Sequence, residues 1–103
     1  MPDAVGRSVL ARLRRLGPDA ESLAAAAAVF GEGAGLNRVA ALAGLDEERA
    51  ERAADALVAA GFLDADGTLA YRQGLAAAAV HEDIPPVRRS RMHRRAAELL
   101  AEG

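Results

Sequence analysis

The chain has 103 residues, which is enough for one compact domain and too few for two. Its formal net charge of −2 gives no general electrostatic reason to bind nucleic acid or an anionic membrane. It has no cysteine, which excludes disulfides, thiolate metal sites and cysteine nucleophiles. Its first residues do not resemble a signal peptide and its alanine run is too short to span a bilayer, so we expect a cytoplasmic protein with no membrane contact.

The composition predicts a thin hydrophobic core. Hydrophobic residues make up 51% of the chain and aromatic residues only 3%, and much of the apolar count is alanine. Because an alanine side chain buries little apolar surface, each such position contributes little stability. Small side chains also let helices approach one another closely, so we expect tightly spaced helices.

Two amphipathic helices are predicted at the start of the chain. Apolar side chains recur every three or four positions over residues 5–16, which places them on one helical face. Gly17 and Pro18 end that helix and begin a second one, which runs to about residue 30. A flexible glycine-rich turn over residues 31–35 follows. The side chains expected to face the core are Val5, Val9, Leu13, Leu16, Leu23, Ala27 and Phe30.

Two more helices and a hairpin are predicted next. A short helix over residues 36–43, with Gly44 as its C-terminal cap, precedes a longer one over residues 47–60, for which Asp46 is a suitable N-cap. Residues 62–71 then indicate a small β-hairpin turned by an Asp-Gly pair. The side chains expected to be buried in these helices are Val39, Leu42, Ala50, Ala54, Leu57 and Val58.

Two helices are predicted to close the chain. The first covers residues 75–82, because the residue before Pro85 avoids the helical conformation, and Pro86 can open the last one. The residues expected to be buried in the last helix are Met92, Ala96, Leu99 and Leu100.

The order of these elements predicts a mainly α fold with a winged-helix core. The second helix, the short helix, the helix from residue 47 and the hairpin match a helix-turn-helix followed by a short β-hairpin. In this interpretation the core (18–72) lies between a leading helix (1–17) and a C-terminal helical pair (73–103), all within a single domain.

DNA binding is the obvious function of a winged helix, but the charge of the helix from residue 47 argues against it. The N-terminal turn that would enter the major groove carries three consecutive acids, Asp46, Glu47 and Glu48. Over residues 46–55, five carboxylates stand against two guanidinium groups. Since DNA readers gain affinity by neutralising phosphates with basic side chains, we expect this segment not to bind DNA directly.

A basic cluster lies instead in the last predicted helix. Arg88, Arg91 and Arg95 share one helical stripe, with Arg89 and Arg94 beside it. This interaction patch could bind phosphate groups or a neighbouring domain. The plainer interpretation is a solvated helix face, partly neutralised by pairing of Arg94 with the glutamate four residues further on.

No arrangement of residues predicts catalysis or metal binding. The glycine-rich turn has no preceding strand and no Walker lysine, so it does not match a nucleotide-binding loop. His81 and His93 are the only histidines and lie on different predicted helices, while Glu82 and Asp83 point in other directions than His81. We therefore expect no catalytic residue, no metal and no cofactor in this chain.

Several segments, taken in order, resemble the winged-helix region of LuxR-type regulators, which are ATP-dependent transcription regulators of the STAND class (signal-transduction ATPases with numerous domains). The segments are PDAV through LARL (2–13), VAALAGL (39–45), ALVAAGFL (56–63) and, as the most specific, VHEDIPP through MHRRAAELL (80–100). The resemblance implies a non-catalytic module of a bacterial protein. It would dock on an upstream nucleotide-binding domain that holds ATP or ADP, and a helical-repeat sensor and a DNA-binding helix-turn-helix would follow it.

The resemblance also implies candidates for a nucleotide contact. In that class a motif after the wing, typically an aromatic residue, any residue, His, Pro and Leu, places its histidine near the nucleotide phosphates. The matching stretch here keeps Tyr71 and Leu75 but has Gln73 in place of the histidine and Gly74 in place of the proline. Gln73 could still donate one hydrogen bond to phosphate, with Arg72 adding charge nearby, or Gln73 could only begin a surface helix.

Three functions stay open from the sequence. The first is the regulatory module, whose partners would be the ATPase and sensor domains of its own protein. The second is a free-standing winged-helix DNA-binding repressor, which would have to contact DNA through Arg88, Arg91 and Arg95. The third is an interaction adaptor whose thin core is completed by a partner, and an isolated module of this kind could form a homodimer.

Overall fold

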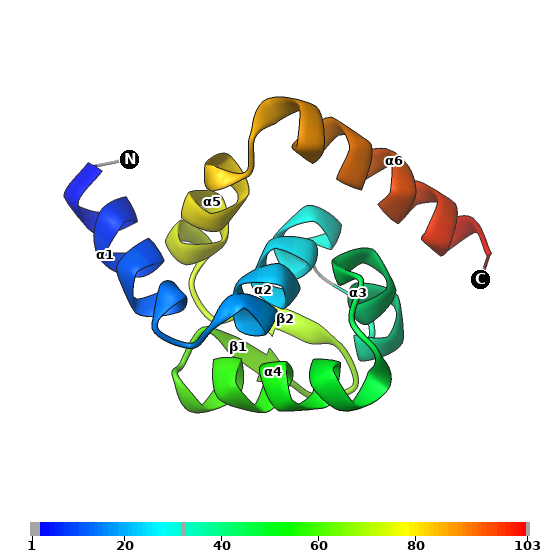
Figure 1. Ribbon diagram of the computed structural model, residues 1–103, viewed down its shortest axis with the longest axis horizontal. Coiled ribbons are helices and arrows are strands. Elements are labelled where there is room, and N and C mark those ends of the chain that lie inside the picture. Colours follow the sequence, from blue (N-terminus) through cyan, green and yellow to red (C-terminus); the bar gives the residue numbers. More distant parts are fainter. Residues whose placement is uncertain (1–2, 32, 103) are drawn as a thin grey trace.

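The computed structural model describes residues 3–31 and 33–102, which form six helices and a two-stranded antiparallel sheet (Figure 1). The elements are α1 (Asp3–Arg14), α2 (Pro18–Phe30), α3 (Leu36–Ala43), α4 (Glu47–Ala59), β1 (Leu63–Ala65), β2 (Leu69–Tyr71), α5 (Gly74–Asp83) and α6 (Pro86–Ala101). The predicted order of helices and strands is confirmed, and the fold is mainly helical. No helix within these residues has both the length and the apolar character needed to cross a bilayer.

Local chemistry sets several helix boundaries. The Asp46 carboxylate accepts a hydrogen bond from the backbone N–H of Arg49 at 2.8 Å and so caps α4 as predicted. Gly44 ends α3 at a φ of 76°, in the left-handed conformation that residues with a Cβ rarely adopt. α1 ends at Arg14 rather than Leu16, because the N–H of Leu16 bonds to the carbonyl of Leu13 in a tight turn.

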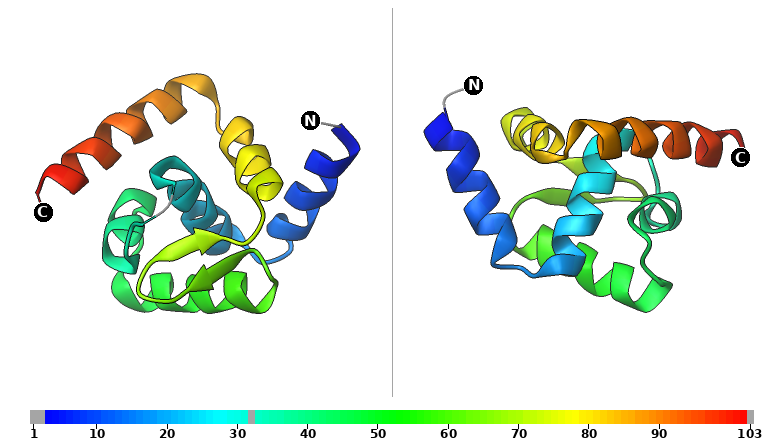
Figure 2. Two further views of the ribbon diagram at one scale, coloured as in Figure 1. Left: turned by 180° about the vertical axis from the view of Figure 1, so that it is seen from behind. Right: turned by 45° about the horizontal axis from the view of Figure 1, so that its top comes forward.

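The central element is α2, which packs against each of the other five helices. Two of them, α4 and α6, lie on opposite sides of it, at the bottom and the top of Figure 1, and the views in Figure 2 agree. The buried side chains of α2 are mostly small: Ala20, Leu23, Ala24, Ala26, Ala27 and Val29. Alanine at four of these positions lets several helices approach the same segment closely.

The hairpin is attached to α2 by the turn before α3 and by Tyr71. Leu69 in β2 donates its N–H to the carbonyl of Ala34 at 2.9 Å, so a third short segment lies beside the two strands. The Tyr71 hydroxyl donates to the carbonyl of Ala24 in α2 at 2.6 Å, and burial of this side chain raises the pKa of Tyr71. Both contacts hold the hairpin against the central helix.

Most of the predicted core is buried, but three predicted core residues are wrong. Val5 is 40% exposed, Val58 is 39% exposed and Leu100 is 52% exposed. Val5 and Leu100 lie in the first turn of α1 and the last turn of α6, where the neighbouring helices give little cover. Val58 follows the fully buried Leu57, so it points about 100° away from the core around α4. Periodicity indicates which face is apolar, but not how far the neighbours extend along it.

Candidate functional site

Two exposed regions of opposite charge lie on different sides of the molecule. We call the first the acidic face; it consists of exposed carboxylates of α4 and the hairpin, namely Glu47, Glu48, Glu51, Asp55, Asp64 and Asp66. The basic side is built on α6, at the opposite side of the molecule, with α2 and α3 between the two (Figures 1 and 2). The two sides are described in turn.

The two arginines of α4 do not neutralise the acidic face. Arg49 makes two hydrogen bonds to the carboxylate of Asp19 in α2, at 2.7 and 3.0 Å. This contact lowers the pKa of Asp19 and raises the pKa of Arg49, in both cases mainly through the hydrogen bond. Arg52 pairs with Glu48 one turn away at 3.1 Å. Arg49 is therefore engaged with α2, and Arg52 offsets one carboxylate of the acidic face, while for Glu47, Glu51 and Asp55 no ion pair is found among the described residues.

A shallow depression of about 270 Å³ lies between α4 and the hairpin. Its lining combines two acids with small and apolar side chains: Leu36, Glu51, Ala54, Asp55, Ala65, Gly67, Thr68 and Leu69. A basic side chain of a partner protein could place its alkyl stem on the apolar part and its charge near the carboxylates.

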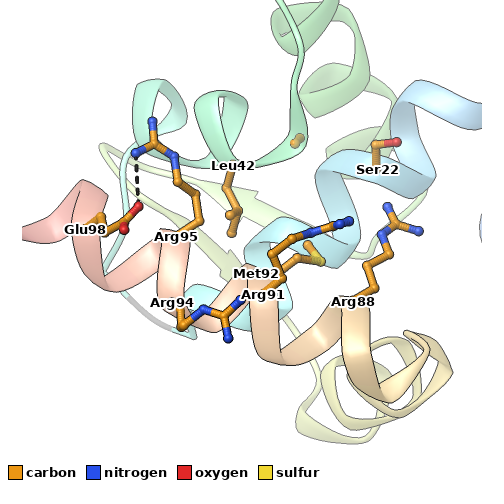
Figure 3. Close-up of a pocket in the computed structure, with 9 residues that line it drawn as sticks. Ser22, Leu42, Arg88, Arg91, Met92, Arg94, Arg95 and Glu98 are labelled. Carbon is orange, nitrogen blue, oxygen red and sulfur yellow. Dashed lines mark hydrogen bonds and ion pairs between the residues drawn. The ribbon is translucent and has the colours of Figure 1, made fainter.

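A larger groove of about 440 Å³ lies between α6, α2 and α3 (Figure 3). We call it the arginine groove. Arg88 and Arg91 extend towards α2, and Arg95 extends towards α3. The full lining is Ser22, Leu42, Ala43, Arg88, Arg91, Met92, Arg94, Arg95 and Glu98, in which four arginines stand against one glutamate. Met92 is only 7% exposed and forms part of an apolar floor.

The predicted basic cluster is therefore largely brought together, with two differences. Arg89 turns away from the groove and donates to the carbonyl of His81 at 3.2 Å, near the C-terminus of α5, where a cation is favoured. The expected pair between Arg94 and Glu98 is wrong, because Glu98 pairs with Arg95 at 3.3 Å on the neighbouring turn. Glu102 lies 3.8 Å from the same nitrogen of Arg95. Arg95 is the arginine of the groove that is held in place.

The two candidates for a nucleotide contact lie elsewhere. Gln73 is exposed at the N-cap position of α5, and its side chain makes no capping hydrogen bond within the described residues. The Arg72 side chain is half exposed and lies 3.6 Å from Asp64 on the hairpin. Because α5 has ten residues and is about 15 Å long, both candidates are at its far end from the arginine groove. The structure does not bring them into that site.

Sequence reasoning missed the contact between His81 in α5 and His93 in α6. Their Nε2 atoms are 2.8 Å apart and their ring centroids 5.1 Å apart. The distance between the centroids exceeds the distance between the nitrogens by one ring radius for each of the two rings, so the two nitrogens lie on the line between the ring centres. This is the geometry of a head-on N–H···N hydrogen bond and not of two lone pairs that converge on a metal. No periodicity relates two residues across the Pro85-Pro86 corner, which is why the contact could not be found from spacing.

The environment of His81 favours its neutral form. Burial lowers the pKa of His81, the nearby charges of His93 and Arg89 lower it further, and Glu82 acts in the opposite direction. A neutral His81 can accept a hydrogen bond from an N–H of His93, or donate one from its own N–H to His93. Among residues 3–31 and 33–102, no group of three or more histidine, aspartate or glutamate side chains is placed to hold a metal ion.

Comparisons with protein-family models, with curated proteins and with solved structures found no match. The resemblance to LuxR-type regulators therefore stays a prediction from the sequence.

Proposed function

We propose that this chain is a non-catalytic regulatory module with a winged-helix core, part of a LuxR-type ATP-dependent transcription regulator, and that it binds protein through its acidic face. The observation that carries the proposal is the charge of α4. The helix in the position of a DNA reader exposes Glu47, Glu51 and Asp55, while Arg49 is paired with Asp19 of α2 and Arg52 with Glu48 one turn away.

The arrangement of the core supports the winged-helix part of the proposal. Three helices, α2, α3 and α4, pack against one another, and the hairpin follows them and packs on α4. The bridge between Ala34 and Leu69 gives the hairpin a third short segment, located between the first and second of these helices. This order of helices and strands is the one expected for a helix-turn-helix with a wing.

Electrostatics favours a protein partner over DNA for this surface. A duplex carries closely spaced phosphates, and a protein that binds it gains affinity from basic contacts that release counterions. The acidic face has the wrong sign for that gain. A partner surface rich in Arg or Lys would instead form charge-assisted hydrogen bonds with the carboxylates and direct the encounter.

In the regulator that the resemblance implies, the partner is the nucleotide-binding domain. Gln73, exposed at the hairpin end of α5, is available to such a domain, and Arg72 beside it is exposed but paired with Asp64. ATP or ADP would be held by that domain, and this module would transmit its nucleotide state to a helical-repeat sensor. Under this proposal the module itself performs no reaction.

The genomic context tests the identity of the parent protein. A Walker motif encoded in the same reading frame upstream of Met1, with helical repeats downstream of Gly103, is the expected result. A reading frame that encodes neither would contradict the proposed parent, whatever surface the module uses.

Binding measurements test the surface. The upstream domain is titrated with this chain in a calorimeter, and Glu47→Gln with Glu51→Gln is expected to weaken binding about tenfold. The matched control is Glu82→Gln with Glu102→Gln, which removes the same charge elsewhere and should change the affinity less than about twofold. Equal losses in both pairs would sink the assignment to the acidic face.

The arginines of α6 favour one second candidate, a DNA-binding repressor that contacts phosphates through Arg88, Arg91 and Arg95. This candidate predicts duplex binding with a steep salt dependence that flattens when the three arginines are replaced by alanine. If the chain is the regulatory module, neither the unchanged chain nor the triple alanine variant should bind duplex DNA sequence-specifically at about 0.15 M salt.

A further inference from the structure

The arginine groove concentrates positive charge that folding does not explain. Arg88, Arg91 and Arg95 lie on successive turns of one helix, and like charges three or four residues apart destabilise a helix. Only Arg95 has a carboxylate partner; for Arg88, Arg91 and Arg94 no ion pair is found within the part of the chain that the structure describes. The arginines of α4, in contrast, are both paired. The charge on α6 is therefore available to a ligand.

The shape of the groove suits a small molecule. Its volume of about 440 Å³ falls within the range of ordinary ligand pockets. Its floor is apolar, with Leu42 and Ala43 from α3 and Met92 from α6, and Ser22 of α2 adds one hydroxyl. The side chains of Arg88, Arg91 and Arg95 stand around this floor (Figure 3). Arg88 and Arg91 lie on the α2 side of the floor and Arg95 on the α3 side, and an apolar floor between charged groups suits an anion that carries an organic body.

The spacing of the arginines indicates how many anionic groups the ligand carries. From Arg88 to Arg95 the helix rises roughly 10 Å, which is more than a single carboxylate or phosphate can bridge. Each guanidinium presents a planar fork that matches two oxygens of a phosphoryl group. Two or more phosphoryl groups would therefore be needed to engage the arginines along the groove.

We infer that the arginine groove binds a small organic polyphosphate, with its phosphoryl groups on Arg88, Arg91 and Arg95 and its apolar part on Leu42 and Met92. Glu98 holds Arg95 in a fixed direction, so part of the site is ordered before the ligand arrives. This site is separate from the acidic face, and the inference does not depend on the proposed docking function.

The proposal is tested with tripolyphosphate as the probe, titrated into the full chain at low and at about 0.15 M salt and followed by NMR and calorimetry. Saturable binding with backbone shift changes at Ser22, Leu42 and Ala43 is expected. The variant Arg88→Gln with Arg91→Gln should bind at least about tenfold more weakly. Glutamine has a helix propensity close to that of arginine, so α6 should stay folded, and circular dichroism checks this.

The matched control is Arg7→Gln on α1 with Arg15→Gln in the turn that follows it, which removes the same charge from another exposed part of the surface. This control should change the affinity for tripolyphosphate by less than about twofold relative to the unchanged chain, because distant charges are screened by salt. Equal weakening in both double variants, or no shift changes around the groove, would overturn the proposal. A duplex oligonucleotide that displaces the probe and binds more tightly would also overturn it, because the arginines would then serve a DNA backbone.

Discussion

The exposed sides of α4 and α6 carry opposite charge, although both helices pack against α2. On α4 one arginine reaches Asp19 of α2 and the other pairs with Glu48 on its own helix, which leaves an excess of exposed carboxylates. On α6 one arginine is paired with glutamates, Arg89 turns to α5, and the other three line a groove. A formal net charge of −2 conceals this separation completely. The comparison teaches that the distribution of charge over the surface, and not its sum, indicates the class of partner for each side.

The two helices are also anchored differently, and substitutions in their cores should show the largest effect. Leu57 of α4 is fully buried, whereas Leu99 of α6 keeps 6% of its surface exposed near the end of the helix. Leu57→Ala is expected to lower the free energy of unfolding by about 3 kcal/mol, and Leu99→Ala by about 2 kcal/mol. Urea denaturation measures both. If Leu99→Ala were the more damaging, the acidic side would not be the more firmly held one.

The hydroxyl of Tyr71 should contribute less than the core of α4. Tyr71→Phe removes the hydrogen bond to Ala24 and keeps the ring, so a loss of about 1 kcal/mol in the free energy of unfolding is expected. Thr68→Ala on the exposed turn of the same hairpin is the control, with a change below about 0.5 kcal/mol. An unchanged stability in Tyr71→Phe would mean that strand pairing and the Ala34 contact alone hold the hairpin on α2.

The histidine contact should make the α6 side sensitive to pH. Because the pKa of His81 is lower in the folded chain than its ordinary value, the unfolded chain binds more protons as the pH falls. Stability from this group is present above about pH 6.5 and decreases as the pH drops below it. The decrease in stability between pH 7 and 5 should be smaller in His81→Gln. Denaturation at several pH values would contradict this if both proteins showed the same slope.

The smallest effect on stability is expected at Glu98, whose pair with Arg95 is half exposed. Glu98→Gln should change the free energy of unfolding by less than about 0.5 kcal/mol. It should at the same time raise the affinity of the arginine groove for tripolyphosphate about two- to threefold, because one negative charge leaves the lining. A fall in affinity would show that the role of Glu98 in holding Arg95 outweighs its charge.

Much of this fold could be read from the sequence because its signals are local. Gly17 with Pro18, Gly44 and Asp46 each mark a helix end through their own backbone or side-chain chemistry, and α2 and α3 have the predicted bounds. The exposure of Leu100 could not be predicted in this way. It depends on where a helix outgrows its neighbours, which is a property of the packed chain.

The candidate sites, like the fold, could be predicted from the sequence only in part. Three arginines on one helical stripe follow from spacing alone, so the cluster on α6 was predictable. The groove beside this cluster could not be predicted, because part of its lining comes from Ser22 on α2 and Leu42 on α3, which are far from α6 in the sequence. The pairing of Arg49 with Asp19 is non-local too, and it removes from the acidic face a positive charge that simple counting retains. Sequence patterns supplied the charges, and packing decided which of them stay exposed.

The alanine residues of α2 have a consequence for how this chain can change. The exposed sides of α4 and α6 lie on opposite sides of α2, so substitutions in the exposed side chains of one should add to those in the other without coupling. The alanines between them have no such freedom, since one extra methyl group at Ala24 or Ala27 would push several helices outward together. Descendants of this protein could therefore change the binding partner of the acidic face while keeping the ligand of the arginine groove, or the reverse, provided that the buried alanines of α2 are kept.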